Sequence, residues 1–367
     1  MSKKIILVIF LIQVLSALLM GMFTFLLPGI LINGVFVLAY SIGSLIPIGF
    51  RRGVNFQYRA VSQRDFVFSY FVLFLCLVVF IDGALVMPSI GAIFHGDVAF
   101  VRGFLLESQI KYWQPRLIGY ISVFQTIYAI YWGLMGYRGR TFFFQAIFIS
   151  LLNTLLVFGR GYLMMNIFAI AYYMLLRRAP KYLLLGIVLM IFMLFVGMEY
   201  LRHPEDGLLS GVATFSEYLI MPLVGSTYNI NMDVVISYFC QSSFFSIFTA
   251  GCVGDLSKQV VSIPNNYLQT NVYGAVGEWL ASLDILVVPL LGIVFGVLAT
   301  ISELIYSPKL ESLGIYLIGI FSFFCFFSDP FTANGFYFSL LLVWLFWMIA
   351  SKVLRNAYYV PQSKVEK

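Results

Sequence analysis

Charged side chains stand beside long apolar runs at three places in this 367-residue chain. Arg160 lies in "FGRGYL", Arg202 and His203 lie in "YLRHPEDG", and Glu278 lies in "TNVYGAVGEW". Arginine presents a planar fork of donors that matches phosphate oxygens, and a histidine or a carboxylate can accept a proton. These four residues are the candidate catalytic residues, and their types fit an anion clamp beside a general base.

Each of these positions also has a purely structural explanation. Arg160 could extend to lipid phosphates, although the glycines on both sides leave its backbone open to close approach by a ligand. Arg202 and His203 could anchor the end of a helix, with three acidic residues as ion-pair partners: Glu199, Glu205 and Asp206. The residues alone leave both explanations open.

Polar and aromatic residues gather between positions 265 and 273. Asparagine amides and tyrosine rings together make a hydrogen-bonding and stacking surface that is typical of carbohydrate contact. The same run also fits the entry of an amphipathic helix, with Asn271 or Thr270 as N-cap and Trp279 at the membrane interface. The candidate substrate-binding residues are Asn266, Tyr267, Asn271, Tyr273, and the outer cations Arg102, Arg116 and Lys258.

We expect no metal and no cofactor. The two histidines are far apart and the four cysteines are dispersed, so no zinc-ligand spacing occurs, and no glycine-rich phosphate loop follows a strand. Cys240 and Cys252 fall in one outer segment, where they would pair only in an oxidising compartment. That pairing stays open.

The elements that position these residues must be membrane helices. Hydrophobic residues make up 61% of the chain and charged residues only 10%, which excludes an ordinary soluble domain. About 20 apolar residues are needed to cross the hydrocarbon. Such runs predict an all-α polytopic transmembrane bundle of about ten spans, near 5–27, 30–49, 66–90, 116–135, 141–158, 161–176, 182–200, 280–302, 312–328 and 334–350.

Two features of the amino-terminal region shape this prediction. The basic start and apolar run resemble a signal peptide, but the run is too long for one, so we interpret it as a retained first helix. Pro28-Gly29 is expected to be the break between the first two helices, because proline ends a helix and glycine tolerates a turn.

Basic residues predict the orientation. With both termini inside, 16 of the 22 lysines and arginines fall in inner segments, as the positive-inside rule requires. The net charge of +6 therefore reflects topology and not a nucleic-acid surface. The whole chain, 1–367, is then one membrane domain with a large outer loop over 201–279, whose apolar stretch from 218 to 248 fits either the interface or re-entry into the bundle.

This layout resembles the Wzy-type polymerases of O-antigen and capsular polysaccharide. The likeness rests on the "GR" turn at Arg160, the arginine after the helix that opens the main outer loop at Arg202, and the "N-x-Y" run followed by glycine and an acidic residue at Asn271, Tyr273 and Glu278. It covers about residues 140 to 300. The "GAVGEWLAS" run departs from the family's more usual threonine and "DFG" pattern, which leaves the role of Glu278 open.

The resemblance implies a metal-independent membrane glycosyltransferase in the bacterial inner membrane, active on the periplasmic face. Its substrates would be oligosaccharide repeat units on undecaprenyl pyrophosphate, and its partners membrane lipids and a chain-length regulator protein. By resemblance, Arg160 and Arg202 hold the pyrophosphate leaving group, His203 or Glu278 accepts the proton, and the loop over 201–279 holds the glycan.

Three other functions fit the same sequence. An O-antigen ligase has similar helices and a similar outer loop, but its acceptor is lipid A core. A lipid-linked oligosaccharide flippase or other transporter would carry charges along a central path, whereas Asp82 is almost the only ionisable group deep within an expected span. A structural membrane scaffold would leave the clustering of arginine, histidine and asparagine at one face unexplained.

Overall fold

The computed structural model describes residues 1–46, 61, 63–88, 112–136, 140–157, 159, 161–202, 212, 215, 219–227, 261–262, 269–270, 276–277, 280, 285–304 and 308–325. Its longer helices are α1 (Ser2–Leu19), α2 (Phe23–Gly43), α3 (Gln63–Val86), α6 (Gln114–Leu134), α7 (Thr141–Val157), α8 (Gly161–Leu176), α9 (Lys181–Arg202), α14 (Val287–Leu304) and α15 (Pro308–Phe324). One small antiparallel pair, β1 (Val261–Ser262) with β2 (Gln269–Thr270), accompanies them.

Four of these helices are long and apolar enough to cross a membrane: α1, α2, α3 and α6. Shorter apolar helices are α7, α8, 185–194 within α9, and 287–301 within α14. Their length and composition indicate a helical, membrane-associated protein. The spans expected at 141–158 and 161–176 match α7 and α8 to within one residue, whereas the expected span at 334–350 lies outside the described residues.

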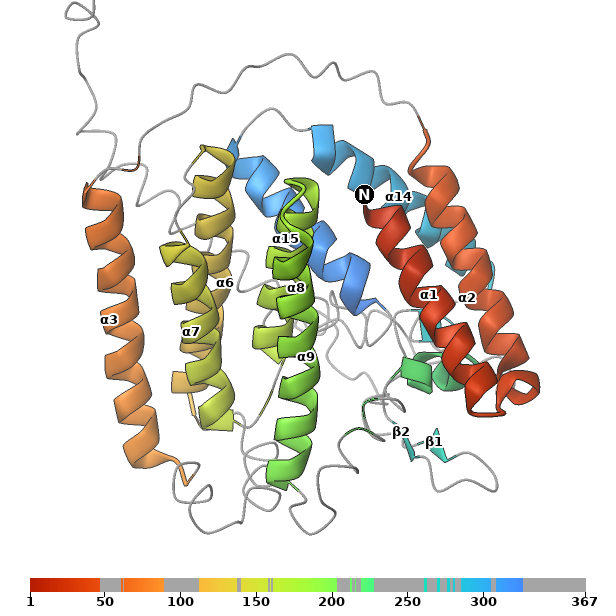
Figure 1. Cartoon of the computed structure of the whole chain (residues 1–367), viewed down its shortest axis with the longest axis horizontal. Coiled ribbons are helices and arrows are strands. Elements are labelled where there is room, and N and C mark those ends of the chain that lie inside the picture. The colour runs from red at the N-terminus through yellow and green to blue at the C-terminus, as the bar shows by residue number, and fades with distance from the viewer. Residues whose placement is uncertain are drawn as a thin grey trace, which may run out of the picture.

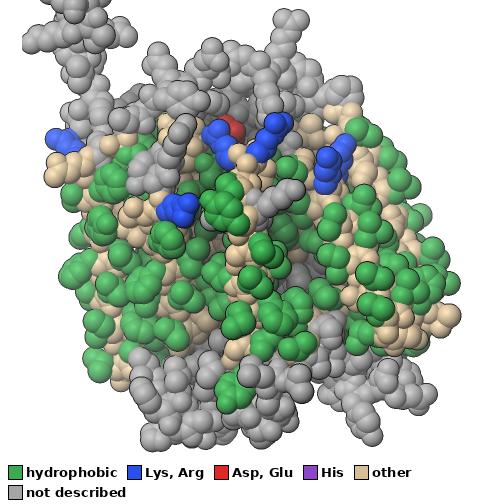
Figure 2. All heavy atoms as spheres, viewed as in Figure 1, with side chains coloured by type: hydrophobic (Ala, Val, Ile, Leu, Met, Phe, Trp, Pro, Cys, Tyr) green, Lys and Arg blue, Asp and Glu red, His purple; other side chains and the backbone are tan. Residues whose placement is uncertain are grey.

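Consecutive helices run in opposite directions across the bundle (Figure 1). The start of α1, the end of α2, and the starts of α3, α7, α9 and α15 lie at the upper end in that view, which we call the basic end. The described Lys and Arg side chains visible in Figure 2 gather toward it. The other end, where α7 and α8 meet and α9 finishes, is called the site end.

The bundle has two groups of helices with α15 between them (Figure 1). One group contains α3, α6, α7 and α8, and the other contains α1, α2 and α14. Phe321 of α15 packs against Phe36 and Tyr40 of α2, and its ring lies 4.4 Å from that of Phe295 on α14. On the opposite side Phe323 stacks on Phe168 of α8, so aromatic packing joins both groups through one helix.

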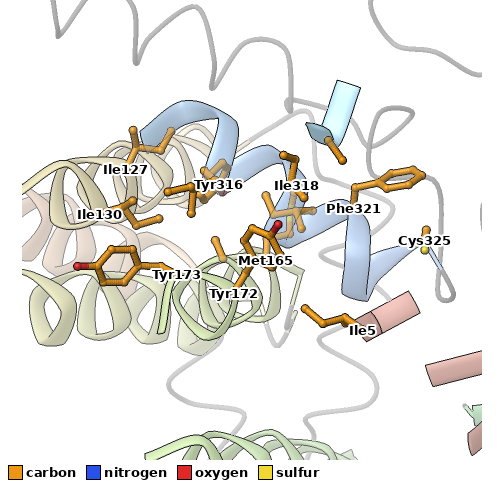
Figure 3. Close-up of a cluster of buried hydrophobic side chains, with 14 of the residues drawn as sticks. Ile5, Ile127, Ile130, Met165, Tyr172, Tyr173, Tyr316, Ile318, Phe321 and Cys325 are labelled. Carbon is orange, nitrogen blue, oxygen red and sulfur yellow. The ribbon is translucent and has the colours of Figure 1, made fainter. Parts of the chain in front are cut away.

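The core around α15 is apolar and contains large aromatic side chains (Figure 3). Gly319 allows α15 to lie against α8, because a Cβ there would be 2.9 Å from the Cα of Ala169. Close backbone approach between small residues is a general means of packing helices in lipid, where no hydrophobic force acts between them.

The expected break at Pro28-Gly29 is wrong. The chain turns instead at Gly21, whose φ of 69° lies in the left-handed region that glycine adopts at little cost. Pro28 lies inside α2, where it removes one backbone donor without ending the helix. Neighbouring elements can supply replacement hydrogen bonds for a proline in a buried helix, and here residues 219–227 contact α2 at this point.

The helix expected at 280–302 also begins later than predicted. Residues 276, 277 and 280 are helical, a turn follows at 285 and 286, and α14 begins at Val287. The apolar pattern runs across this interruption, so periodicity alone does not reveal it.

Helices α2 and α14 pack backbone to backbone through glycines. A Cβ at Gly43 would overlap the carbonyl oxygen of Ile293, and a Cβ at Gly296 would overlap that of Tyr40. Gly292 approaches Ala39 and Phe36 in the same way. Because the obstructing atoms belong to the backbone, a side chain at these positions requires the helices to move apart.

We predict that Gly43→Ala destabilises the fold by about 1–3 kcal/mol, the usual range for overpacking. Gly34→Ala in the same helix is the matched control, because its Cβ would lie 3.5 Å from the nearest atom, the ring of Phe10. Alanine favours helix over glycine, so the control should be neutral or stabilising. Thermal unfolding in detergent measures both, and equal midpoints for the two variants would contradict this packing.

Candidate functional site

The "GRG" turn joins α7 to α8 at the site end. Helix α7 ends at Val157 and α8 begins at Gly161, within one residue of the expected spans. Arg160 itself lies outside the described residues. A Cβ at Gly161 would meet nothing within 4 Å, so the backbone at the start of α8 is open to approach.

Both sides of this turn are fixed to α6. Before the turn, the Asn153 amide of α7 donates to the carbonyl oxygen of Pro115 in the first turn of α6. After the turn, the Tyr162 ring lies directly over Gly119 of α6, where any Cβ would overlap it. The turn is therefore held by a hydrogen bond on one side and by a glycine contact on the other.

Asn166 joins four helices in the interior of the bundle, close to the turn. This fully buried side chain donates to Ser122 Oγ of α6 at 2.9 Å and to Ser150 Oγ of α7 at 2.7 Å. Its carbonyl oxygen accepts from the Tyr316 hydroxyl of α15 at 3.1 Å. Both amide hydrogens and the amide oxygen are thus used, about 8 Å along α8 from the turn at 1.5 Å per residue.

The serines of this network are themselves satisfied. Ser122 donates to the Gly119 carbonyl and Ser150 to the Ala146 carbonyl, each within its own helix. In hydrocarbon, polar groups without partners are costly, so a network in which every member is bonded has one favoured arrangement. Six residues lie on the bundle side of the "GRG" turn, and we call them the platform: Asn153, Asn166, Ser122, Ser150, Gly119 and Tyr316.

Arg116 is the one predicted site residue whose side chain the structure describes. It is exposed in the first turn of α6, at the site end. Tyr120 follows it one helical turn later, and the Tyr120 ring meets that of Tyr162 edge to face at 6.3 Å. Arg116 therefore lies on the same helix surface as a tyrosine pair that leads to the start of α8, beside the "GRG" turn.

Arg202 is the last residue of α9, and of its side chain nothing is described. Helix α9 packs on α8 through Ile191, which contacts Met164 and Phe168. Because α9 has 22 residues and the antiparallel α8 has 16, α9 extends about 9 Å beyond the start of α8 at the site end. The end of α9, which carries Arg202, and the start of α8, which follows Arg160, thus belong to adjacent helices.

The other predicted site residues lie outside the described residues. On either side of Glu278, Val276, which is 3% exposed, and Leu280 pack into the main core. β1 and β2 flank the segment that contains Asn266 and Tyr267. The structure does not describe eight of the predicted site residues: His203, Glu278, Asn266, Tyr267, Asn271, Tyr273, Arg102 and Lys258.

Sequence reasoning missed the platform. Its signal was present as amides and hydroxyls within apolar helices, which in membrane proteins face the bundle interior. Among the described residues, no cluster of three or more His, Cys, Asp or Glu could hold a metal ion.

No protein-family model, curated protein or solved structure matches this chain. The functional assignment therefore depends on the motifs in the sequence and on where the helices carry them.

We predict that Asn166→Leu destabilises the fold by about 2 kcal/mol, since three side-chain hydrogen bonds at about 0.6 kcal/mol each are lost. Ser41→Ala is the control, because its hydroxyl bonds only the Val37 carbonyl of its own helix. Chemical unfolding in mixed micelles compares the two. A loss for Asn166→Leu no larger than that for Ser41→Ala would show that the platform does not hold the helices together.

Proposed function

We propose that this protein is a membrane polymerase that joins oligosaccharide repeat units carried on undecaprenyl pyrophosphate. The main support is the placement of two sequence motifs on adjacent helices. The α7–α8 turn contains Arg160, and α9 ends at Arg202, both at the site end. The offset of about 9 Å between the start of α8 and the end of α9 suits two flexible arginine side chains that meet on one diphosphate.

In the proposed reaction the bond between the anomeric carbon and the diphosphate oxygen breaks, and its electron pair leaves with the pyrophosphate. A hydroxyl of the terminal sugar on a second lipid-linked unit attacks that carbon and loses its proton to His203 or Glu278. Arg160 and Arg202 stabilise the charge that develops on the leaving oxygen. Arg102, Arg116 and Lys258 contribute to substrate binding, with Asn266, Tyr267, Asn271 and Tyr273 as glycan contacts.

We further propose about ten spans with both termini in the cytoplasm and the site end in the periplasm of a bacterial inner membrane. The alternating helix directions support this arrangement (Figure 1). The exposed cations at the basic end, which include Lys4, Arg64, Arg140, Arg177 and Lys309, support it through the positive-inside rule. The segment 201–279 would then be the periplasmic loop.

Arg202→Lys tests the fork of donors separately from the charge. We expect polymer formation to slow about 100-fold, the lower range for loss of one electrostatic donor, because lysine cannot bond two phosphate oxygens in parallel. Arg64→Lys, an exposed arginine at the basic end, is the matched control and should leave the rate unchanged. Incorporation of purified lipid-linked units measures both variants, and a wild-type rate for Arg202→Lys would contradict bidentate binding.

Deletion with complementation separates the polymerase from the other functions. We expect the deleted strain to display one repeat unit per anchor where the parent displays a ladder on a gel. Complete absence of surface repeats would instead indicate a ligase or a transporter. Purified protein supplied only with lipid-linked units should make a ladder, which a ligase that lacks lipid A core would not.

A further inference from the structure

Residues 219–227 form a helix inside the segment that the sequence assigns to the outer loop. Ile220, Leu223 and Ser226 of this helix are completely buried, and Val224 and Thr227 are 2% exposed. Its apolar residues pack against Ala17 of α1 and against Met22, Leu26 and Ile30 at and after the turn into α2. Figure 1 draws the stretch in green beside the lower parts of α1 and α2.

The contact with α2 is made by hydrogen bonds as well as by apolar packing. The Asn33 amide donates to Ser226 Oγ at 3.0 Å, and also to the Gly29 carbonyl one turn earlier in α2. The Gly29 N–H donates to Thr227 Oγ1 at 3.1 Å. Ser226 and Thr227 in turn donate to carbonyls one turn earlier in their own helix, so neither hydroxyl lacks a partner.

Pro28 and Gly29 make this approach possible. Proline has no N–H, and its ring crowds the carbonyl one turn earlier, which weakens the helical hydrogen bonding around it. The next donor in α2, Gly29 N–H, meets a hydroxyl from the docked helix. A Cβ at Gly29 would overlap the carbonyl oxygen of Leu223, so the two backbones touch where glycine follows proline.

The contact lies well inside the bundle. Asn33 is ten residues after the start of α2, about 15 Å along a helix whose whole length is about 31 Å. Phe215, earlier in the same segment, packs between α8 and α9 and meets the Phe192 ring at 5.3 Å. The chain beyond α9 therefore contacts both groups of helices inside the bundle, in the half nearer the site end.

We propose that residues 219–227 are a re-entrant helix that dips into the membrane, and that Pro28, Gly29 and Asn33 form its docking site in α2. The segment 201–279 is then tied at a fixed point to the amino-terminal helix pair. Under the polymerase proposal, Asn33 is a positioning residue for the loop that holds the glycan, but the docking itself holds whatever the protein's function is.

Cysteine accessibility tests this placement without any assay of activity. In the full-length chain with its four native cysteines replaced, Ser226→Cys and Glu205→Cys are each treated in intact cells and in inverted vesicles with a membrane-impermeant maleimide. Glu205 belongs to the charged stretch "RHPED" and is chosen as the reference because charged side chains are costly in hydrocarbon. We expect Ser226→Cys to react about tenfold more slowly than Glu205→Cys from the side where the latter reacts, and at the same rate after denaturation.

Two substitutions in α2 then test the docking site. Adding Gly29→Leu to Ser226→Cys should raise its labelling to the rate of Glu205→Cys, because the leucine side chain displaces the docked helix. Adding Gly34→Ala, whose Cβ has room, should leave Ser226→Cys protected. Labelling of Ser226→Cys as fast as Glu205→Cys in intact membranes would overturn the re-entrant helix, whether or not the Gly29→Leu variant folds.

Cross-linking in the same cell membranes tests directly whether positions 33 and 226 lie close together. An Asn33→Cys, Ser226→Cys pair should be joined by the shortest bifunctional thiol reagent, as detected by mass spectrometry, whereas Asn33→Cys with Glu205→Cys should not. Absence of the first cross-link together with rapid labelling at position 226 would refute the docking. If both results hold but the unsubstituted protein makes no polymer from lipid-linked units, the docking stands and the polymerase proposal fails.

Discussion

Within an apolar bundle a buried polar group without a partner is costly, and two buried asparagines show how hydrogen bonds between helices meet this cost. Asn166 uses its whole amide on three neighbouring helices, and Asn33 divides its amide between its own helix and residues 219–227. A displaced helix would leave several such groups unbonded in hydrocarbon. The hydrogen bonds therefore specify which helices meet and at what height.

Glycine makes the second contribution, because helices in lipid gain stability from close contact and not from the hydrophobic effect. Gly43 and Gly296 bring α2 and α14 together, Gly119 accommodates the Tyr162 ring, and Gly29 receives the 219–227 helix. Each contact excludes a Cβ, so a shift of one residue in register would replace it by a clash. Polar and glycine contacts thus act together to fix how the helices pack.

This arrangement bears on the proposed chemistry in one respect. Electrostatic catalysis depends on donors that are already in place when charge develops, since donors that must reorganise lose most of their effect. The platform fixes the "GRG" turn from α6, α7, α8 and α15, and α9 packs on α8 beside it. The helices that lead to Arg160 and Arg202 are therefore packed neighbours, which suits the proposed anion clamp.

The amino-acid pattern is sufficient to predict a helical, membrane-associated protein, the order of the described helices and most of their limits to within four residues, because apolar runs of span length favour hydrocarbon. It also located the α7–α8 turn to within a residue. The roles of Pro28-Gly29, Asn33 and Asn166 emerge from the three-dimensional packing alone. Proline, glycine and buried amides depend on what lies opposite them, and residues 198 positions apart, such as Gly29 and Thr227, carry no local signal of their contact.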